Sequence, residues 1–78
     1  MNTQKVMDRD NKYIMHTYGR SPVVIERGEG MTAIDAEGRK YLDFTSGIGV
    51  NSLGFAYPAW VAAVTAQAGK LPHTSNLY

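Results

Sequence analysis

Three glycines in the middle of the chain are the residues whose spacing most suggests chemistry. Gly47, Gly49 and Gly54 lie in the stretch GIGVNSLG, which has the pattern G-x-G-x4-G. A dinucleotide-binding fingerprint needs G-x-G-x2-G at the start of a helix, so the spacing disfavours nucleotide binding. Glycine also lets the backbone approach a ligand or another chain closely, because it has no Cβ. We interpret the stretch as such a close-approach segment.

The acidic, histidine and tyrosine side chains form no self-sufficient catalytic set in the sequence. Asp35 and Asp43 could pair as two carboxylates, but the pattern favours a turn-forming role for Asp35 and a surface role for Asp43, which lies among basic residues. His73 could act as a base, yet no nucleophile and orienting group accompany it, so we interpret it as a loop histidine. Tyr18 stands between a helix end and a proline-led strand, where it could cap a pocket or simply pack.

Composition narrows the class of protein. The chain has 78 residues, 44 % hydrophobic and 19 % charged, which is enough for one domain at most. The absence of cysteine excludes disulfides and thiolate metal sites, and His16 and His73 have no partners at metal-ligand spacing. A net charge of +1 without a basic stripe argues against a nucleic-acid partner. No apolar run approaches the roughly 20 residues that cross a bilayer, and the polar N-terminus differs from a signal peptide. We therefore expect a cytoplasmic protein with no membrane partner.

The elements that must position these residues can be predicted along the chain. Residues 3–16 are compatible with a thinly apolar helix that needs a surface to dock on, and residues 17–21 form a connector. Three β-branched or alternating runs, at residues 22–27, 31–35 and 39–44, predict antiparallel strands. Gly28, Glu29 and Gly30 predict the first reversal, and DAEG at residues 35–38 predicts a hairpin turn.

The second half of the sequence predicts an irregular loop followed by a helix. Residues 45–56 have neither helical nor strand periodicity, which is typical of a binding loop. Pro58 suits the first turn of a helix and Gly69 its end, and an apolar stripe between them should pack this helix onto the preceding loop. The predicted fold class is α+β, with an N-terminal helix, a three-stranded antiparallel β-meander, a glycine-rich loop and a C-terminal helix.

From about Tyr18 to its end, the sequence resembles the N-terminal portion of class III, pyridoxal-phosphate-dependent aminotransferases, and within them acetylornithine aminotransferases. The matching residues are PVVIERGEGMTAIDAEGRKYLDFTSGIGVNSLG, Tyr57 with Pro58, Gln67, and HTSNLY. The resemblance implies a fragment of the small domain of a fold-type I PLP transferase. It divides the chain into residues 1–21, an N-terminal helical arm and connector, and residues 22–78, the N-terminal part of the small domain, with the large PLP domain absent.

The resemblance also implies substrate-binding residues. Tyr18 matches a family tyrosine near the distal end of the substrate in related ornithine-type enzymes. Gly47, Ile48 and Gly49 match the loop that lines the substrate side of the pocket. Ile48 stands where some relatives carry a tyrosine, which suits a bulkier or uncharged distal group such as an acylated amine.

Further family positions concern the subunit interface and the cofactor. Ser75 and Asn76 match a segment near the interface of a homodimer, and Phe55 stands where the family usually has a histidine. The family's Schiff-base lysine and phosphate-cradling loop lie beyond position 78, so we expect no catalytic residue here and no binding of pyridoxal phosphate by this fragment. The lysines that do not match the catalytic one are Lys5, Lys12, Lys40 and Lys70.

The function implied by the resemblance is a transamination of arginine biosynthesis. The full enzyme would transfer an amino group from N-acetylornithine to 2-oxoglutarate through pyridoxal phosphate, while the isolated 78-residue chain is expected to be inactive. Two alternatives stay open. One is a segment of another ω-amine transaminase, acting on ornithine or 4-aminobutyrate. The other is a non-catalytic module that self-associates, since exposed strand edges and a thin core favour homo-oligomers.

Overall fold

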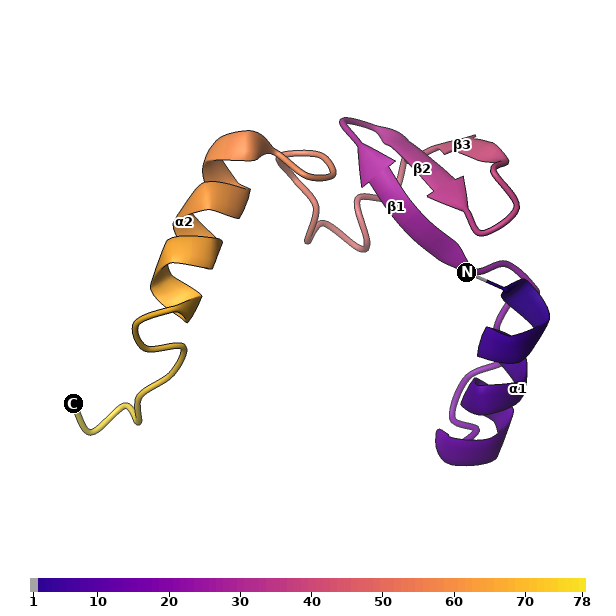
Figure 1. Cartoon of the computed structure of the whole chain (residues 1–78), viewed down its shortest axis with the longest axis horizontal. Helices are drawn as coiled ribbons and strands as arrows, with labels where there is room; N and C mark the ends of the chain where they lie inside the picture. The colour runs from indigo at the N-terminus through magenta and orange to yellow at the C-terminus, as the bar shows by residue number, and fades with distance from the viewer. Residues whose placement is uncertain (1) are drawn as a thin grey trace.

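The computed structural model describes residues 2–78, in which two helices flank a three-stranded sheet (Figure 1). The chain forms an arch with the sheet at its centre and one helix descending on each side. This arrangement confirms the predicted α+β class. The elements are α1 (Thr3–Tyr13), β1 (Ile25–Glu29), β2 (Thr32–Asp35), β3 (Lys40–Leu42) and α2 (Pro58–Ala68).

The helix α1 is shorter than the predicted span of residues 3–16. It begins after Asn2, whose side-chain Oδ1 accepts a hydrogen bond from the Lys5 amide at 2.9 Å. It ends at Tyr13 because Ile14 takes up extended geometry, with φ −103° and ψ 135°. The Nε2–H of His16 then donates to a carbonyl of the last helical turn at 2.8 Å, which folds the connector back along the helix.

The three strands form an antiparallel meander in the order β1-β2-β3. Gly28 pairs with Ala33, and Ala33 pairs with Tyr41, so these three residues lie side by side across the sheet. The predicted reversal at residues 28–30 is wrong by about two positions. Glu29 still pairs with Thr32, so residues 30–31 make the turn. Gly30 has φ 57°, which the first position of a two-residue hairpin turn requires.

The turn between β2 and β3 is organised around the carboxylate of Asp35. Its Oδ1 accepts hydrogen bonds from the backbone amides of Glu37 and Arg39, both at 2.9 Å. Its Oδ2 accepts from the Arg39 Nε at 2.7 Å and from the Tyr41 hydroxyl at 2.8 Å. The Gly38 amide donates to the Asp35 carbonyl at 3.0 Å, and Gly38 has φ 86°. The predicted hairpin turn is therefore confirmed.

These hydrogen bonds also control the charge of Asp35, which is only 2 % exposed. Burial by itself raises the pKa of the Asp35 carboxyl, because it disfavours the charged form. Hydrogen bonds from Arg39, Tyr41 and the Glu37 amide outweigh burial and hold the pKa well below its usual value of 3.8. The same contact with Asp35 raises the pKa of the Tyr41 hydroxyl. Asp35 is thus a buried, charged centre of the turn.

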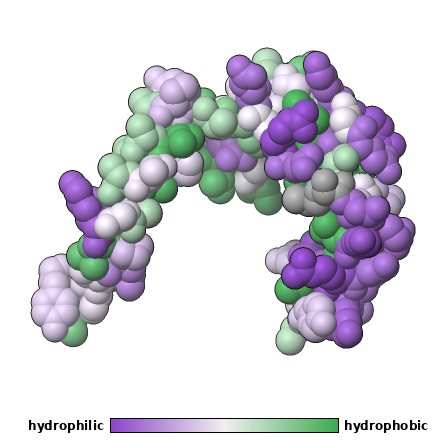
Figure 2. Space-filling view, viewed as in Figure 1, coloured by the Kyte–Doolittle hydropathy of each residue, from purple (hydrophilic) through white to green (hydrophobic). Residues whose placement is uncertain are grey.

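The helix α2 lies apart from the sheet, and of its apolar stripe Trp60 lines a hollow together with residues 50–57 of the preceding loop. Among the described elements, only the three strands pack against one another. Trp60, Val61 and Val64 are 57 %, 41 % and 45 % exposed, so the apolar stripe is uncovered. Figure 2 shows apolar surface along this arm, whereas the sheet and α1 are mostly hydrophilic. Neither helix in the described part of the chain is long and apolar enough to cross a membrane.

The parent hairpin should lose stability at acidic pH as Asp35 becomes protonated, and the substitution Asp35→Asn should abolish this loss. A group whose folded pKa lies below its unfolded pKa stabilises the fold above the unfolded pKa, and this contribution is lost as pH falls through the folded pKa. We expect the hairpin's free energy of unfolding to fall progressively as pH decreases from about 4 toward about 2. Urea unfolding followed through the amide resonances of Gly38 and Arg39 measures this change.

A matched control is Asp8→Asn, on the exposed surface of α1, where the Asp8 side chain accepts a hydrogen bond from Gln4 at 2.9 Å. This variant should keep the acid-induced loss of hairpin stability. The interpretation of Asp35 is wrong if Asp35→Asn retains the pH dependence of the parent chain.

Candidate functional site

The segment between β3 and α2 contains an unusual left-handed turn. Ser46, Gly47, Ile48 and Gly49 have φ values of 53°, 59°, 60° and 85°. L-residues adopt such values at a cost of roughly 1–2 kcal/mol each, and for a β-branched residue such as isoleucine they are a genuine outlier. The two glycines make the turn possible by alternating with the strained residues. We name residues 44–54 the glycine loop.

The glycine loop begins at a cap formed by Asp43. Its Oδ1 accepts hydrogen bonds from the backbone amides of Thr45 at 3.0 Å and Ser46 at 2.9 Å, and from the Thr45 hydroxyl at 3.2 Å. Asp43 is half-buried and forms this turn, which agrees with the turn-forming and surface roles that the sequence favoured over a carboxylate pair. The D-x-T-S pattern was a detectable signal, because aspartate commonly bonds backbone amides two residues further on.

Both ends of the glycine loop are fixed to one hairpin turn. At the start, the Asp43 amide donates to the Met31 carbonyl at 2.8 Å. At the end, Gly30 and Phe55 form an antiparallel bridge with hydrogen bonds of 3.1 Å and 2.7 Å between their backbones. The loop therefore leaves from and returns to two adjacent residues of the β1–β2 turn.

Close approach of the backbone explains Gly54. Its φ is 82°, and a Cβ added there would lie 2.9 Å from the Gly30 carbonyl oxygen and 3.2 Å from two further backbone atoms. The sequence suggested that these glycines allow approach to a ligand or another chain. At Gly54 the approaching partner is the chain's own hairpin. Gly49, with φ 85°, has open space around the position of an added Cβ.

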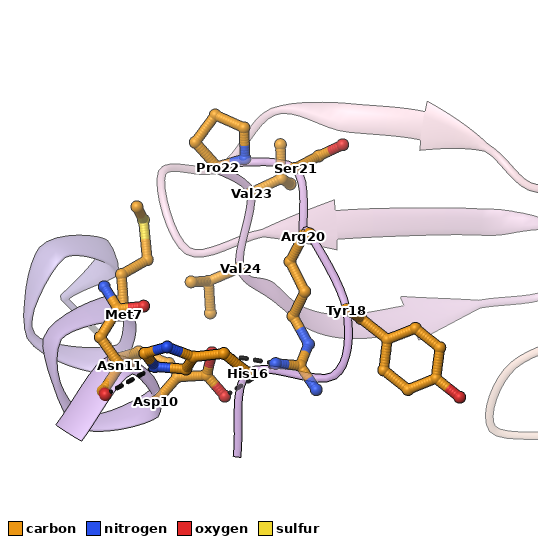
Figure 3. Close-up of a pocket in the computed structure, with 12 residues that line it drawn as sticks. Met7, Asp10, Asn11, His16, Tyr18, Arg20, Ser21, Pro22, Val23 and Val24 are labelled. Carbon is orange, nitrogen blue, oxygen red and sulfur yellow. Dashed lines mark hydrogen bonds and ion pairs between the residues drawn. The ribbon is translucent and has the colours of Figure 1, made fainter. Parts of the chain in front are cut away.

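Tyr18 lies at a separate hollow between α1 and the connector (Figure 3). This pocket encloses about 430 Å³. The Arg20 guanidinium closes one side by donating to both carboxylate oxygens of Asp10, at 3.1 Å and 3.0 Å. Figure 3 shows the Tyr18 ring pointing away from the other labelled side chains, and Tyr18 is 77 % exposed. Tyr18 is therefore available to a molecule outside the pocket.

The structure does not assemble the predicted site residues into one cavity. Tyr18 lines the pocket beside α1, whereas a second pocket of about 260 Å³ is lined by residues 50–57 and Trp60. Gly47, Ile48 and Gly49 line neither of these two pockets, and Ile48 is 96 % exposed. The turn carrying Ile48 thus presents an apolar side chain outward from a fixed loop.

The predicted interface residues lie in the exposed tail after α2. The Ser75 hydroxyl oxygen accepts a hydrogen bond from the Leu77 amide at 3.2 Å, and the Ser75 carbonyl accepts one from the Tyr78 amide at 3.1 Å. Asn76 and His73 are exposed in the same segment. Within residues 2–78, no group of three or more histidine, aspartate or glutamate side chains is placed to hold a metal ion.

Comparison with known proteins places the chain in a family. Residues 13–78 match the family described as Aminotransferase class-III. This match covers most of the chain, so the chain belongs to the class III aminotransferases. The resemblance noted in the sequence is confirmed.

The particular relatives carry acetylornithine and ornithine aminotransferase names. Acetylornithine aminotransferase of Haemophilus ducreyi is 50 % identical over 78 residues, which cover 100 % of this chain and 20 % of that protein. The acetylornithine aminotransferase structure from Elizabethkingia anophelis matches with a TM-score of 0.86 and 37 % identity, over 100 % of this chain and 20 % of that one. Ornithine aminotransferase from Toxoplasma gondii, which has PLP at partial occupancy in its active site, matches with a TM-score of 0.84 and 31 % identity, over 99 % and 18 %. The chain spans about one fifth of the length of these relatives.

The family implies dependence on pyridoxal phosphate, but residues 2–78 do not fit this cofactor by themselves. Binding requires a lysine amine for the aldehyde and donors that surround the phosphate. The four lysines are all exposed, and none lines the pocket beside Tyr18 or the pocket beside Trp60. Of these lysines, Lys40 lines a shallow hollow at the β1–β2 turn together with Glu29, whose negative charge disfavours a phosphate there.

Alanine substitutions should separate close approach from backbone strain in the glycine loop. Gly49→Ala introduces strain at φ 85° alone, and we expect it to destabilise loop closure by about 1–2 kcal/mol. Gly54→Ala adds a clash with the Gly30 carbonyl at 2.9 Å, so its effect should be larger. Hydrogen exchange of the Phe55 and Gly30 amides, which form the closing bridge, measures the free energy of opening.

Gly19→Ala is the neutral control, because an added Cβ there meets no atom within 4 Å and no positive φ is involved. Equal effects of Gly49→Ala and Gly54→Ala on exchange would contradict the close approach of the loop to the hairpin.

Proposed function

We propose that the chain forms the N-terminal part of the small domain of an acetylornithine-type aminotransferase. In this proposal residues 1–21 are a helical arm and connector, and residues 22–78 belong to the small domain. The large domain that holds pyridoxal phosphate lies outside these residues. The whole enzyme transfers the amino group of N-acetylornithine to 2-oxoglutarate. Relatives of that name, 50 % identical across the whole chain, support the choice of substrate.

The observation that carries the proposal is the strained turn at Ile48. Backbone strain persists only where surrounding structure enforces it, and it concentrates at functional sites. Here the Asp43 cap and the Gly30–Phe55 bridge fix both ends of the loop. The loop presents Ile48 with φ 60° and 96 % exposure. An outward-facing isoleucine on a fixed loop suits a wall that contacts the acetylated amine, which is uncharged and ends in an apolar methyl.

The remaining predicted residues have supporting roles in this proposal. Tyr18, which points outward beside α1, contacts the distal end of the substrate. Ser75 and Asn76, exposed in the tail, lie at the interface of a homodimer. The enzyme acts in the cytoplasm, in arginine biosynthesis. Pyridoxal phosphate, when bound by the whole enzyme, supplies the electron sink, while this segment supplies orientation of the substrate.

A chimaera tests this proposal directly. Residues 1–78 replace the matching segment of the Haemophilus ducreyi enzyme, to which they are 50 % identical. We expect the chimaera to prefer N-acetylornithine over ornithine and 4-aminobutyrate. Ile48→Tyr should lower kcat/KM for N-acetylornithine about tenfold relative to that for ornithine, because a larger side chain crowds the acetyl group. Steady-state kinetics with the three amino donors measure both effects.

Val50→Tyr is the matched control, since Val50 is also exposed in the glycine loop, at 82 %, but lies outside the left-handed turn. It should leave the donor preference unchanged. A chimaera that absorbs as a pyridoxal enzyme but prefers ornithine or 4-aminobutyrate would instead support another ω-amine transaminase.

Self-association is a second candidate function, favoured by the amount of exposed surface. The chain exposes 6901 Å², whereas a compact monomer of 8.6 kDa exposes about 4,700 Å². The difference is larger than the roughly 800 Å² that each partner buries in a typical interface. Trp60, Val61 and Val64 expose part of this apolar surface on α2, which could pair with the same helix of a second copy.

The isolated 78-residue chain should therefore form concentration-dependent oligomers. Val64→Lys on α2 should weaken the association about tenfold, because it replaces roughly 1.5 kcal/mol of apolar burial with a charge. Size-exclusion chromatography with light scattering over a range of concentrations measures the mass. Tyr13→Lys, an exposed apolar position on the mostly polar α1, is the control and should associate as the parent does. A monomer at every concentration would exclude this candidate.

A further inference from the structure

The ring of Phe55 occupies a space that only a glycine on β1 leaves open. A Cβ built on Gly28 would lie 2.5 Å, 2.7 Å and 2.8 Å from three side-chain atoms of Phe55. In the sheet Gly28 stands beside Ala33, which is buried and pairs with Tyr41. The ring therefore covers the sheet face at the point where the strand has no side chain of its own.

The backbone of Phe55 is held at the same place. It pairs with Gly30 through two hydrogen bonds, while its neighbours Gly54 and Ala56 have φ values of 82° and 54°. Because both neighbours of Phe55 have left-handed backbone conformations, no helix or strand holds its backbone in place. The ring on Gly28 and the bridge to Gly30 are the contacts that fix its position. They also fix where the glycine loop ends and, three residues after Phe55, where α2 begins.

We propose that Phe55 is a positioning residue for the glycine loop, acting through its contact with Gly28. The ring locks the loop's end onto the hairpin and so holds the Ile48 turn in its strained, outward-facing conformation. This inference rests on the proposed function for its effect on substrate, but its structural part stands on the contacts alone. The resemblance identified Phe55 only as a departure from the usual histidine, and the structure shows what the phenyl ring contacts.

A double-mutant cycle on Gly28 and Phe55 tests the contact in the 78-residue chain. Gly28→Ala should accelerate exchange of the Gly30 and Phe55 amides, because the added methyl overlaps the ring. Phe55→Ala should also accelerate it, because the covering ring is lost. In the Phe55→Ala background, the further change Gly28→Ala should have little effect, since the space is then free. Additive effects of the two substitutions would overturn the proposal, whatever the activity of the enzyme.

The chimaera tests the consequence for substrate. Phe55→Ala should raise KM for N-acetylornithine about tenfold, with kcat changed by less than about threefold, as expected when binding rather than chemistry is impaired. Phe55→Leu, which keeps apolar bulk over Gly28, should recover most of the affinity, and Gly19→Ala should behave as the parent. A fall in kcat with unchanged KM, or no recovery by leucine, would overturn the positioning role.

The two readouts separate the two proposals. An inactive parent chimaera contradicts the proposed function, and the amide-exchange cycle then decides the role of Phe55 by itself. An active chimaera with an uncoupled cycle leaves the proposed function supported and overturns the role of Phe55.

Discussion

The turn at Gly30 and Met31 is the constraint on which the irregular half of the chain depends. Two adjacent residues receive the start and the end of the glycine loop, through the Asp43 amide and the Gly30–Phe55 bridge. Fixing the two ends at adjacent residues provides the closure of the loop, so its interior is ordered without a separate closure cost. This closure is what allows residues with positive φ to persist in the interior without a regular element around them.

A second constraint, the Asp35 carboxylate, fixes the β2–β3 turn at the opposite end of β2. Four donors saturate the carboxylate, so it remains charged although it is nearly inaccessible to solvent. The network joins the β2–β3 turn to Tyr41 on β3, and β3 leads directly into the Asp43 cap. Polar interactions therefore order a sheet that has almost no apolar core, with Ala33 its only buried hydrophobic residue among those described.

The sheet with its glycine loop and the helix α2 differ in the contacts that hold them. The sheet and loop are self-consistent units, closed by their own hydrogen bonds, whereas α2 carries an uncovered apolar stripe. A class III aminotransferase about five times longer offers surfaces that a 78-residue chain does not contain. An exposed apolar stripe of this kind is typical of a surface that contacts another chain or domain.

Local chemistry by itself determined the α+β class and the positions of α2 and the β2–β3 turn, whereas the family was identified through a resemblance to known sequences. Pro58, Gly38 and the alternation in the strands act within a few residues, so they can be read from the sequence. Tertiary structure decided what depends on distant partners. Gly28 looks like a turn residue until Phe55 is placed over it, and Asp43 looks exposed until it caps the loop. The packing of α2 could not be predicted either, because an apolar stripe indicates burial without identifying the surface that buries it.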